Sequence, residues 1–478
     1  MVDDAYIAVR YAQNLLAGDG LVYNHGQHVL GVTGPLYTIW MAALLLVSPA
    51  DDPGYAIGVA NILFFAFTAL AMLKLAPEVG AKTIALVVLM FSAHLRFVDN
   101  TLVGMETPLF LLGVVLSVLL LREARLTWLF LLLGLLMLVR PEGTLWALSV
   151  VVALAARRQT PRLRQLLPGA AVILVWVVFS GLYYGSPIPH SVLAKSGWFI
   201  GEGKREFWPR IASTFQSLAL LDLPERFRHA AFARAVLGVA TAVSLALFFL
   251  GGRALWRLRS RLVAFPVFFL ACVCFYIVGR GRVDFSWYGI PTGFAYGVTA
   301  IVGGAAVARR LPGWGARARL FAIAVFGAAL LLIGSGVWIW QATRLPYYRV
   351  MRASYEPAGE FVNAHARADA CVVVDELGMI GYRARRTTYD LGGIVSPEIL
   401  RHYAKGNRKY TWSDYLQELR PDYIICSPRN LGQMLTEEGA PWVEANYETV
   451  AEFPAHGVLG KRTATAPGSG GRTAPGAE

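Results

Sequence analysis

Long apolar runs separated by short polar connectors dominate the first 341 residues of the chain. About ten such runs are present, at residues 55–76, 82–98, 107–121, 126–140, 143–157, 167–185, 232–250, 262–279, 287–308 and 318–341. Most approach the roughly 20 residues that a helix needs to cross the hydrocarbon core of a bilayer. The pattern predicts a polytopic α-helical membrane protein, whose membrane domain we place at residues 55–344.

The pattern changes at about residue 345, where the long apolar runs stop. "DACVVVDELGMIGY", "RTTYDLGG", "RPDYIICSP" and "YETVAEFPAHGVLGKR" combine β-branched residues with turn residues, which indicates short strands. "SPEILRHYAKG" and "TWSDYLQELR" have the spacing of amphipathic helices. We therefore expect a small α/β domain over residues 345–462. The Gly-, Pro- and Ala-rich tail at 463–478 is typical of disorder.

Basic connectors between the apolar runs predict the orientation in the membrane. Only 16% of residues are charged, and the net charge is +13. Arginines cluster in four connectors, at Arg122 and Arg125, at Arg157, Arg158, Arg162 and Arg164, at Arg253, Arg257, Arg259 and Arg261, and at Arg309, Arg310, Arg317 and Arg319. Such connectors face the cytoplasm, so the positive charge is not read as nucleic-acid binding. Loops 99–106, 186–231 and 280–286 and the C-terminal domain are then extracytoplasmic.

The first 54 residues form a segment of their own. The apolar run 36–48 is short for a span, which favours an interfacial or re-entrant helix. Asp3 and Asp4 then lie on the extracytoplasmic side. Because nothing in the chain carries them across the membrane, we expect a further transmembrane helix before Met1.

Two adjacent carboxylates, Asp3 and Asp4, open an amphipathic stretch that a Gly-rich turn closes. One of them can act as a general base for an attacking hydroxyl while the other orients it. Mutual repulsion raises the pKa of one member of such a pair. The alternative is an acidic N-cap for the following helix.

Two further polar groups fall on the same predicted face. Glu106, in "GMETPLF", can cap the helix that follows it or line a pocket. Arg140, in "LVRPEGTL", can bind a phosphate or form an ion-paired turn with Glu106 or Glu142.

Two later extracytoplasmic stretches supply cations. His190 and Lys195 lie in "YYGSPIPHSVLAKSG", where the lysine can balance the charge of a leaving phosphate. Arg280, Arg282 and Tyr288 lie in "GRGRVDFSWYGIP". Positive charge outside runs against the orientation rule, so this loop calls for an anionic partner such as a lipid phosphate.

The four cysteines suggest no metal site. Cys272 and Cys274 lie in an apolar run and read as packing residues, and no CxxC or Cys/His spacing is present. A disulfide between Cys371 and Cys426 is compatible with an extracytoplasmic domain.

The block "DDAYIAVRYAQNLLAGDGLVYNHG", followed by "GVTGPLYT", "GMETPLF", "RPEGTL", "GSPIPHSVLAK" and "VVVDELGMIGY", resembles the bacterial GT-C glycosyltransferases. It is most similar to the branch of terminal arabinofuranosyltransferases of actinobacterial cell walls. The resemblance implies that Asp3 and Asp4 are catalytic, and we count Arg10, Tyr11 and Asn14 of the same block as candidate substrate-binding residues. Family members often read "GYTNPLW" where this chain reads "GVTGPLYT", so the sugar and the acceptor stay open.

The resemblance implies a multi-pass enzyme of the inner (plasma) membrane with an extracytoplasmic active site. It would transfer a monosaccharide, with inversion, from a polyprenyl phosphate to a cell-envelope glycan or glycolipid. We expect neither a cofactor nor a metal, because cations of the protein can balance the leaving phosphate. The alternatives are a lipid-linked sugar flippase and a non-catalytic glycolipid-binding membrane protein. No internal repeat, a frequent feature of transporters, is apparent.

Overall fold

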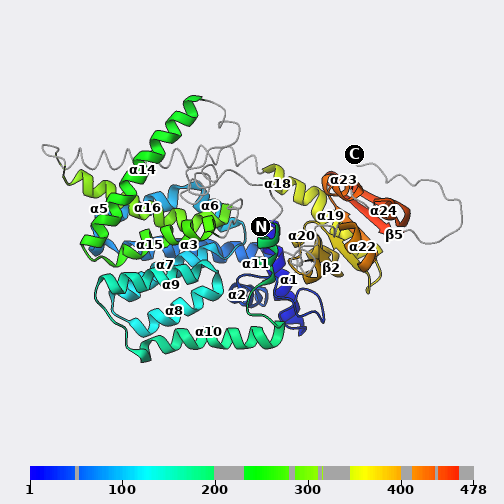
Figure 1. Cartoon of the computed structure of the whole chain (residues 1–478), viewed down its shortest axis with the longest axis horizontal. Coiled ribbons are helices and arrows are strands. Elements are labelled where there is room, and N and C mark those ends of the chain that lie inside the picture. The colour runs from blue at the N-terminus through cyan, green and yellow to red at the C-terminus, as the bar shows by residue number, and fades with distance from the viewer. Residues whose placement is uncertain are drawn as a thin grey trace.

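The computed structural model describes residues 1–48, 53–198, 231–278, 286–310, 315, 345–399, 412–436 and 440–461. The chain is mostly helical, with a body of apolar helices and a C-terminal region that contains a small sheet. Figure 1 shows the helical body and the sheet region on opposite sides of the molecule, with the N-terminus between them.

The helical body follows the apolar runs of the sequence. Its helices are α2 (Pro35–Leu45), α3 (Pro53–Leu73), α4 (Ala76–Val79), α5 (Ala81–Ala93), α6 (Leu95–Leu102), α7 (Thr107–Arg122), α8 (Leu126–Val139), α9 (Glu142–Ala156), α10 (Leu163–Tyr184), α11 (His190–Trp198), α14 (Ala231–Arg257), α15 (Ala264–Val278) and α16 (Ser286–Ala308), with a 3-10 turn at Arg261–Val263. Large apolar side chains of α3, α5 to α9 and α14 to α16 form one buried cluster that includes Phe91, Trp146 and Phe269. The buried residues Tyr37 and Met41 of α2 belong to a separate cluster with α1 (Asp3–Ala17).

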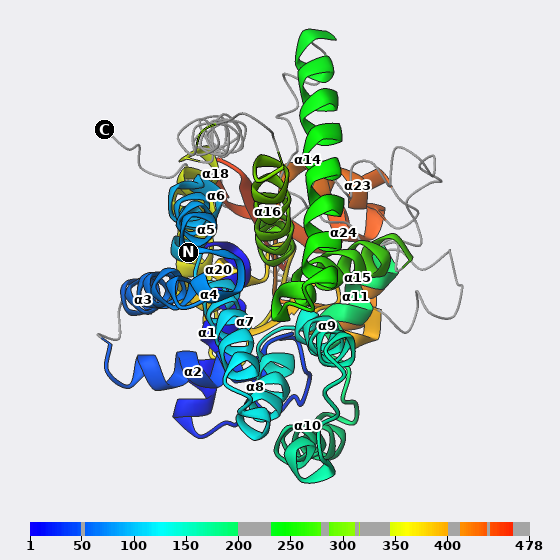
Figure 2. The same ribbon diagram turned by 90° about the vertical axis from the view of Figure 1, so that its left-hand side faces the viewer.

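Three of these helices are long and apolar enough to cross a membrane: Pro53–Leu73, Leu163–Tyr184 and Trp287–Ala308. A helix covers each of the predicted runs except 318–341, which lies outside the described residues. Several helices are shorter than predicted. α2 has 11 residues, or about 16 Å at 1.5 Å per residue, which is too short to cross a bilayer core. α10 lies at the outer edge of the body in both views and exposes most of its apolar side chains (Figures 1 and 2).

The basic connectors gather at one end of the helical body. The Arg122 guanidinium donates to the carbonyl of Lys74. Arg261 pairs with Glu78 at 2.6 Å, and the Arg157 guanidinium donates to the carbonyl of Arg259. Connectors from four places in the sequence therefore meet, which is the arrangement expected if they share one side of the membrane.

The C-terminal region is a mixed five-stranded sheet with short helices. Its helical elements are α18 (Leu345–Val350), a π-helical turn (Met351–Tyr355), α19 (Glu356–His365), α20 (Gly378–Ala384), α22 (Trp412–Leu419), α23 (Pro428–Thr436) and α24 (Ala440–Asn446). The strands are β1 (Cys371–Val374), β2 (Thr387–Asp390), β3 (Tyr423–Cys426), β4 (Tyr447–Phe453) and β5 (His456–Lys461). They lie in the order β2-β1-β3-β5-β4, parallel from β2 to β3 and antiparallel beyond.

The predicted strands and the amphipathic helix at Trp412–Leu419 are present, with one difference. In "DACVVVDELGMIGY" only the first part is a strand, and "GMIGY" belongs to α20. Most of the second predicted helix, "SPEILRHYAKG", lies outside the described residues. Cys371 and Cys426 are free, at opposite ends of neighbouring parallel strands, so the compatible disulfide is not formed.

The first 34 residues share a hydrophobic core with the C-terminal region. α1 (Asp3–Ala17) ends at Gly18, whose φ of +91° suits glycine in the left-handed region. Tyr11, Tyr23 and Leu30 pack in the same cluster as Val372 and Ile380. Segments more than 300 residues apart in the sequence therefore form one packing unit, and α1 lies beside α20 in Figure 1.

Candidate functional site

The two N-terminal aspartates occupy the first turn of α1, between the helical body and the C-terminal region. The backbone N–H of Val2 donates to the carbonyl of Val103 at 2.9 Å, which fixes this turn to the end of the helical body opposite the basic connectors. Asp3 is 4% exposed, whereas Asp4 is only partly buried. The structure thus gives the two carboxylates different surroundings.

Asp3 is held by the backbone of the C-terminal region. Its Oδ2 accepts the N–H of Gly378 at 2.9 Å, and its Oδ1 accepts the N–H of Met379 at 2.6 Å. The N-cap of α1 itself is Val2, which makes no side-chain capping bond. Asp3 therefore does not cap its own helix. Its carboxylate instead accepts the N–H groups of the first two residues of α20.

Two more carboxylates, Asp375 and Glu376, follow strand β1 and lie beside the aspartate pair. Burial, together with the negative charge of Asp4, raises the pKa of Asp3 to about 7 despite the two N–H donors. Burial and the charges of Asp3 and Asp375 raise the pKa of Glu376 to about 9. Glu376 is therefore a neutral carboxylic acid at pH 7.

Asp375 has the opposite shift. Burial acts to raise its pKa, but His456, whose Nε2 lies 3.1 Å from Oδ1, holds it below the usual value, with help from the N–H of Ser427. Four carboxylates thus meet at this junction, and the pKa values of Asp3, Asp375 and Glu376 are shifted in different directions or by different amounts. Such divergence is frequent at functional sites. Sequence reasoning missed Asp375 and Glu376, although two acids directly after a buried strand were a usable signal.

Arg10 fastens α1 to the C-terminal region. Its guanidinium donates to the carbonyls of Gly381 and Arg386, both at 2.6 Å, and to Thr388 Oγ1 at 3.2 Å. It also lies 4.2 Å from the ring centre of Tyr23. The side chain is 9% exposed and joins α1 to α20 and β2.

Tyr11 and Asn14 shape the turn after α1. The Tyr11 hydroxyl donates to the carbonyl of Val29 at 2.6 Å and accepts the N–H of Gly31 at 2.8 Å. Asn14 donates to the carbonyls of Val22 and Tyr23, both at 2.9 Å. These contacts give Arg10, Tyr11 and Asn14 roles in holding the junction, and substrate binding by them stays a prediction.

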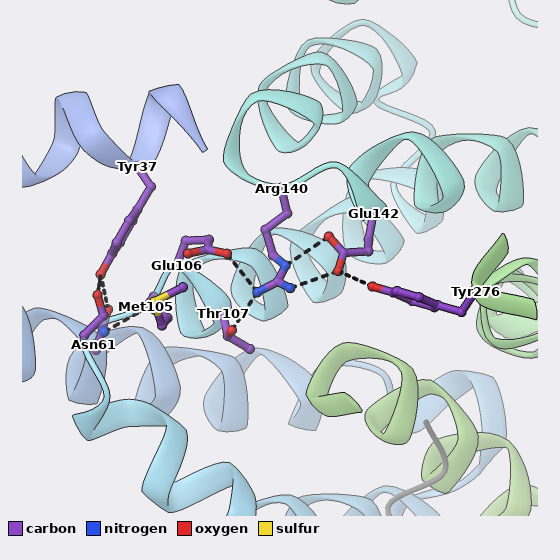
Figure 3. Close-up of polar contacts among 9 residues, drawn as sticks. Tyr37, Asn61, Met105, Glu106, Thr107, Arg140, Glu142 and Tyr276 are labelled. Carbon is purple, nitrogen blue, oxygen red and sulfur yellow. Dashed lines mark hydrogen bonds and ion pairs between the residues drawn. The ribbon is translucent and has the colours of Figure 1, made fainter. Parts of the chain in front are cut away.

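Glu106 and Arg140 meet in a buried network near the same end of the helical body (Figure 3). The Arg140 guanidinium lies 2.9 Å from Glu106 Oε1 and 2.9 Å from Glu142 Oε1, and donates to Thr107 Oγ1 at 2.8 Å. Tyr276 donates to Glu142 at 3.1 Å. Arg140 is 1% exposed, so the ion-paired turn is the arrangement present.

A second polar set extends this layer toward the aspartates. Tyr37 of α2 donates to the carbonyl of Gly104 at 3.1 Å, and Asn61 of α3 donates to the carbonyl of Met105 at 3.1 Å (Figure 3). These bonds fix residues 103–106, which contact both Val2 and Arg140. The aspartate turn and the arginine network are therefore braced by one short segment.

The remaining candidates are placed only in part. His190 begins α11, and its backbone N–H donates to the carbonyl of Leu30 at 2.7 Å. Lys195 lies on the same helix, but its side chain is outside the described residues, as are Arg280 and Arg282. Tyr288 of α16 lies with its ring centre 5.8 Å from the Arg140 guanidinium. The described residues include no group of three or more His, Cys, Asp or Glu side chains arranged to hold a metal ion.

Part of the chain matches a known protein family. Residues 345–472 match a family model described as a domain of unknown function, DUF8728. No curated protein matches the chain. The match covers the C-terminal region that supplies Asp375, Glu376 and the two N–H donors to Asp3.

Proposed function

We propose that the protein is a membrane glycosyltransferase that moves a monosaccharide from a polyprenyl phosphate to a cell-envelope glycan or glycolipid. The observation that carries the proposal is the position of Asp3 and Asp4. They lie where a body of apolar helices meets a folded α/β region, and one of the two carboxylates is less buried. A lipid-linked donor needs an apolar body for its tail and a polar site for its sugar at the same place.

In this proposal Asp4 is the general base. Both carboxylate oxygens of Asp3 already accept backbone N–H groups, and Asp3 is almost fully buried. Asp4 accepts the proton of the acceptor hydroxyl as the hydroxyl oxygen attacks the anomeric carbon. The bond from that carbon to the phosphate oxygen breaks, the configuration inverts, and polyprenyl phosphate leaves.

The charge of the leaving phosphate is assigned to Lys195, Arg280 and Arg282. Arg140 is left out of this role because its guanidinium is buried and engaged by Glu106, Glu142 and Thr107. The basic connectors, gathered at the end of the body away from the aspartates, support an extracytoplasmic site in a multi-pass inner membrane protein.

The test is sugar transfer by the purified full chain from synthetic polyprenyl-phosphoryl arabinose, with mannose and glucose donors in parallel. Asp4→Asn is expected to lower the rate of transfer about 100-fold or more. Asp19→Asn is the matched control, because Asp19 lies after the same helix and pairs with the exposed His25 at 2.8 Å. No transfer from any donor, together with saturable binding of the lipid, would favour a flippase or a non-catalytic glycolipid binder instead.

A further inference from the structure

α1 and the C-terminal region come into close backbone contact at Gly378. A Cβ added there would overlap the backbone oxygen of Asp3 and lie 2.7 Å from Asp3 Cγ. Three residues later, a Cβ on Gly381 would overlap the hydroxyl of Tyr23. Two glycines on α20 thus allow this helix to lie directly on the N-terminal segment, at the position where it meets Asp3.

Further hydrogen bonds from the N-terminal segment hold α20 and the strand that follows it in place. The Tyr23 hydroxyl donates to the carbonyl of Leu377 at 2.7 Å. Asn24 makes two bonds with the backbone of Thr388, donating to its carbonyl at 2.9 Å and accepting its N–H at 3.0 Å. Arg10 adds the contacts described above. The arrangement leaves α20 little freedom to move relative to the first turn of α1.

The orientation of Asp4 follows from the anchoring of Asp3. Adjacent residues on an α-helix point about 100° apart around its axis. With Asp3 fixed toward Gly378 and Met379, Asp4 projects from a different face of α1, where it is only partly buried. A carboxylate acting as base must be held within a fraction of an ångström of the attacking hydroxyl.

We propose that the C-terminal region, through the N–H groups of Gly378 and Met379, holds Asp3 as a positioning residue and thereby orients Asp4 for proton abstraction. The inference rests on the transfer reaction proposed above. It gives the region matched by the family of unknown function a role in the reaction, that of completing the site from the far end of the chain.

The experiment breaks the contact from each side. Gly378→Ala forces the backbones apart without changing either aspartate. Asp3→Asn removes one acceptor and turns an amide N–H toward a backbone donor. Each is expected to lower kcat about 10- to 100-fold, as a displacement of about 1 Å does, while KM changes less than about threefold. Gly432→Ala is the control, because Gly432 is a helical glycine of the same region with open space around its Cα.

A double-mutant cycle separates positioning from general destabilisation. If both variants act through one contact, Asp3→Asn with Gly378→Ala loses no more activity than the worse single variant. Hydrogen exchange of the Gly378 and Met379 amides shows that the contact has opened while the rest of the sheet stays protected.

Three outcomes overturn the inference. An open contact with unchanged kcat, or multiplicative losses in the double variant, overturns this inference alone. If Gly378→Ala does not fold, Asp3→Asn alone tests the inference, through its kcat and the hydrogen exchange of the Gly378 and Met379 amides. A wild-type chain that transfers no sugar from any donor overturns the proposed function, and this inference with it.

Discussion

The carboxyl group of Glu376 makes the stability of the junction depend on pH, and Glu376→Gln tests this. Burial and neighbouring carboxylates raise its pKa from 4.5 to about 9. The folded protein therefore keeps a proton that the unfolded chain loses above about pH 4.5. Its contribution to stability is fully present below pH 4.5 and is lost as the pH rises toward 9.

At pH 7 the difference amounts to about 3 kcal/mol, from about 2.5 pH units at 1.36 kcal/mol each. Asp3 acts in the same direction between pH 3.8 and about 7. For a unit of about 150 residues, about 3 kcal/mol corresponds to a change of about 6–12 °C in Tm. A glutamine keeps the shape of the side chain without the proton to lose, so Glu376→Gln should raise Tm by this amount at pH 7, by more at pH 8 and by much less at pH 5.

The assay is thermal unfolding of the detergent-purified chain at pH 5 and pH 8. Glu398→Gln is the control, since Glu398 is exposed in the same region. An equal change in Tm at both pH values for Glu376→Gln, or the same pH-dependent gain for Glu398→Gln, would refute the role of the Glu376 proton.

Three further predictions concern the arginines. Arg10→Met should destabilise the junction by about 3–5 kcal/mol, because it leaves buried carbonyls unpaired; unfolding in urea checks this, and the exposed Arg429→Met should change little. Arg140→Met leaves two buried carboxylates without their partner and should cost at least about 3 kcal/mol; an unchanged Tm and an unchanged gel-filtration profile would contradict this. In a cysteine-free background, Arg385→Cys should react with a membrane-impermeant thiol reagent added to intact cells and Arg125→Cys should not, and the reverse pattern would refute the orientation.

The helical body was predictable because its signal is local. Apolar runs mark the helices whatever they pack against, and the basic connectors that meet in space were already grouped by charge. Helix ends were less predictable: α10 begins at Leu163, four residues before the predicted run, because polar residues can extend a helix beyond its apolar part. Tyr276 was missed in the arginine network because it reads as one more residue of an apolar run.

The junction was predictable only in part. Asp3 and Asp4 stand out in the sequence, yet nothing local indicates that Gly378 and Met379 bind one of them from 375 residues away. The same holds for Arg10, whose two shortest hydrogen bonds go to backbone carbonyls that carry no sequence signal. The ion pairing of Arg140 with Glu106 and Glu142 could be predicted from the sequence, because charges at adjoining ends of apolar helices have few other partners.

The most direct test of the account is whether Asp4 carries the transfer reaction. Initial rates from polyprenyl-phosphoryl arabinose, mannose and glucose would be compared for the wild-type chain, Asp4→Asn and Asp19→Asn. We expect transfer from one donor, a loss of about 100-fold or more in Asp4→Asn, and a wild-type rate in Asp19→Asn. Undiminished transfer by a well-folded Asp4→Asn variant would contradict it.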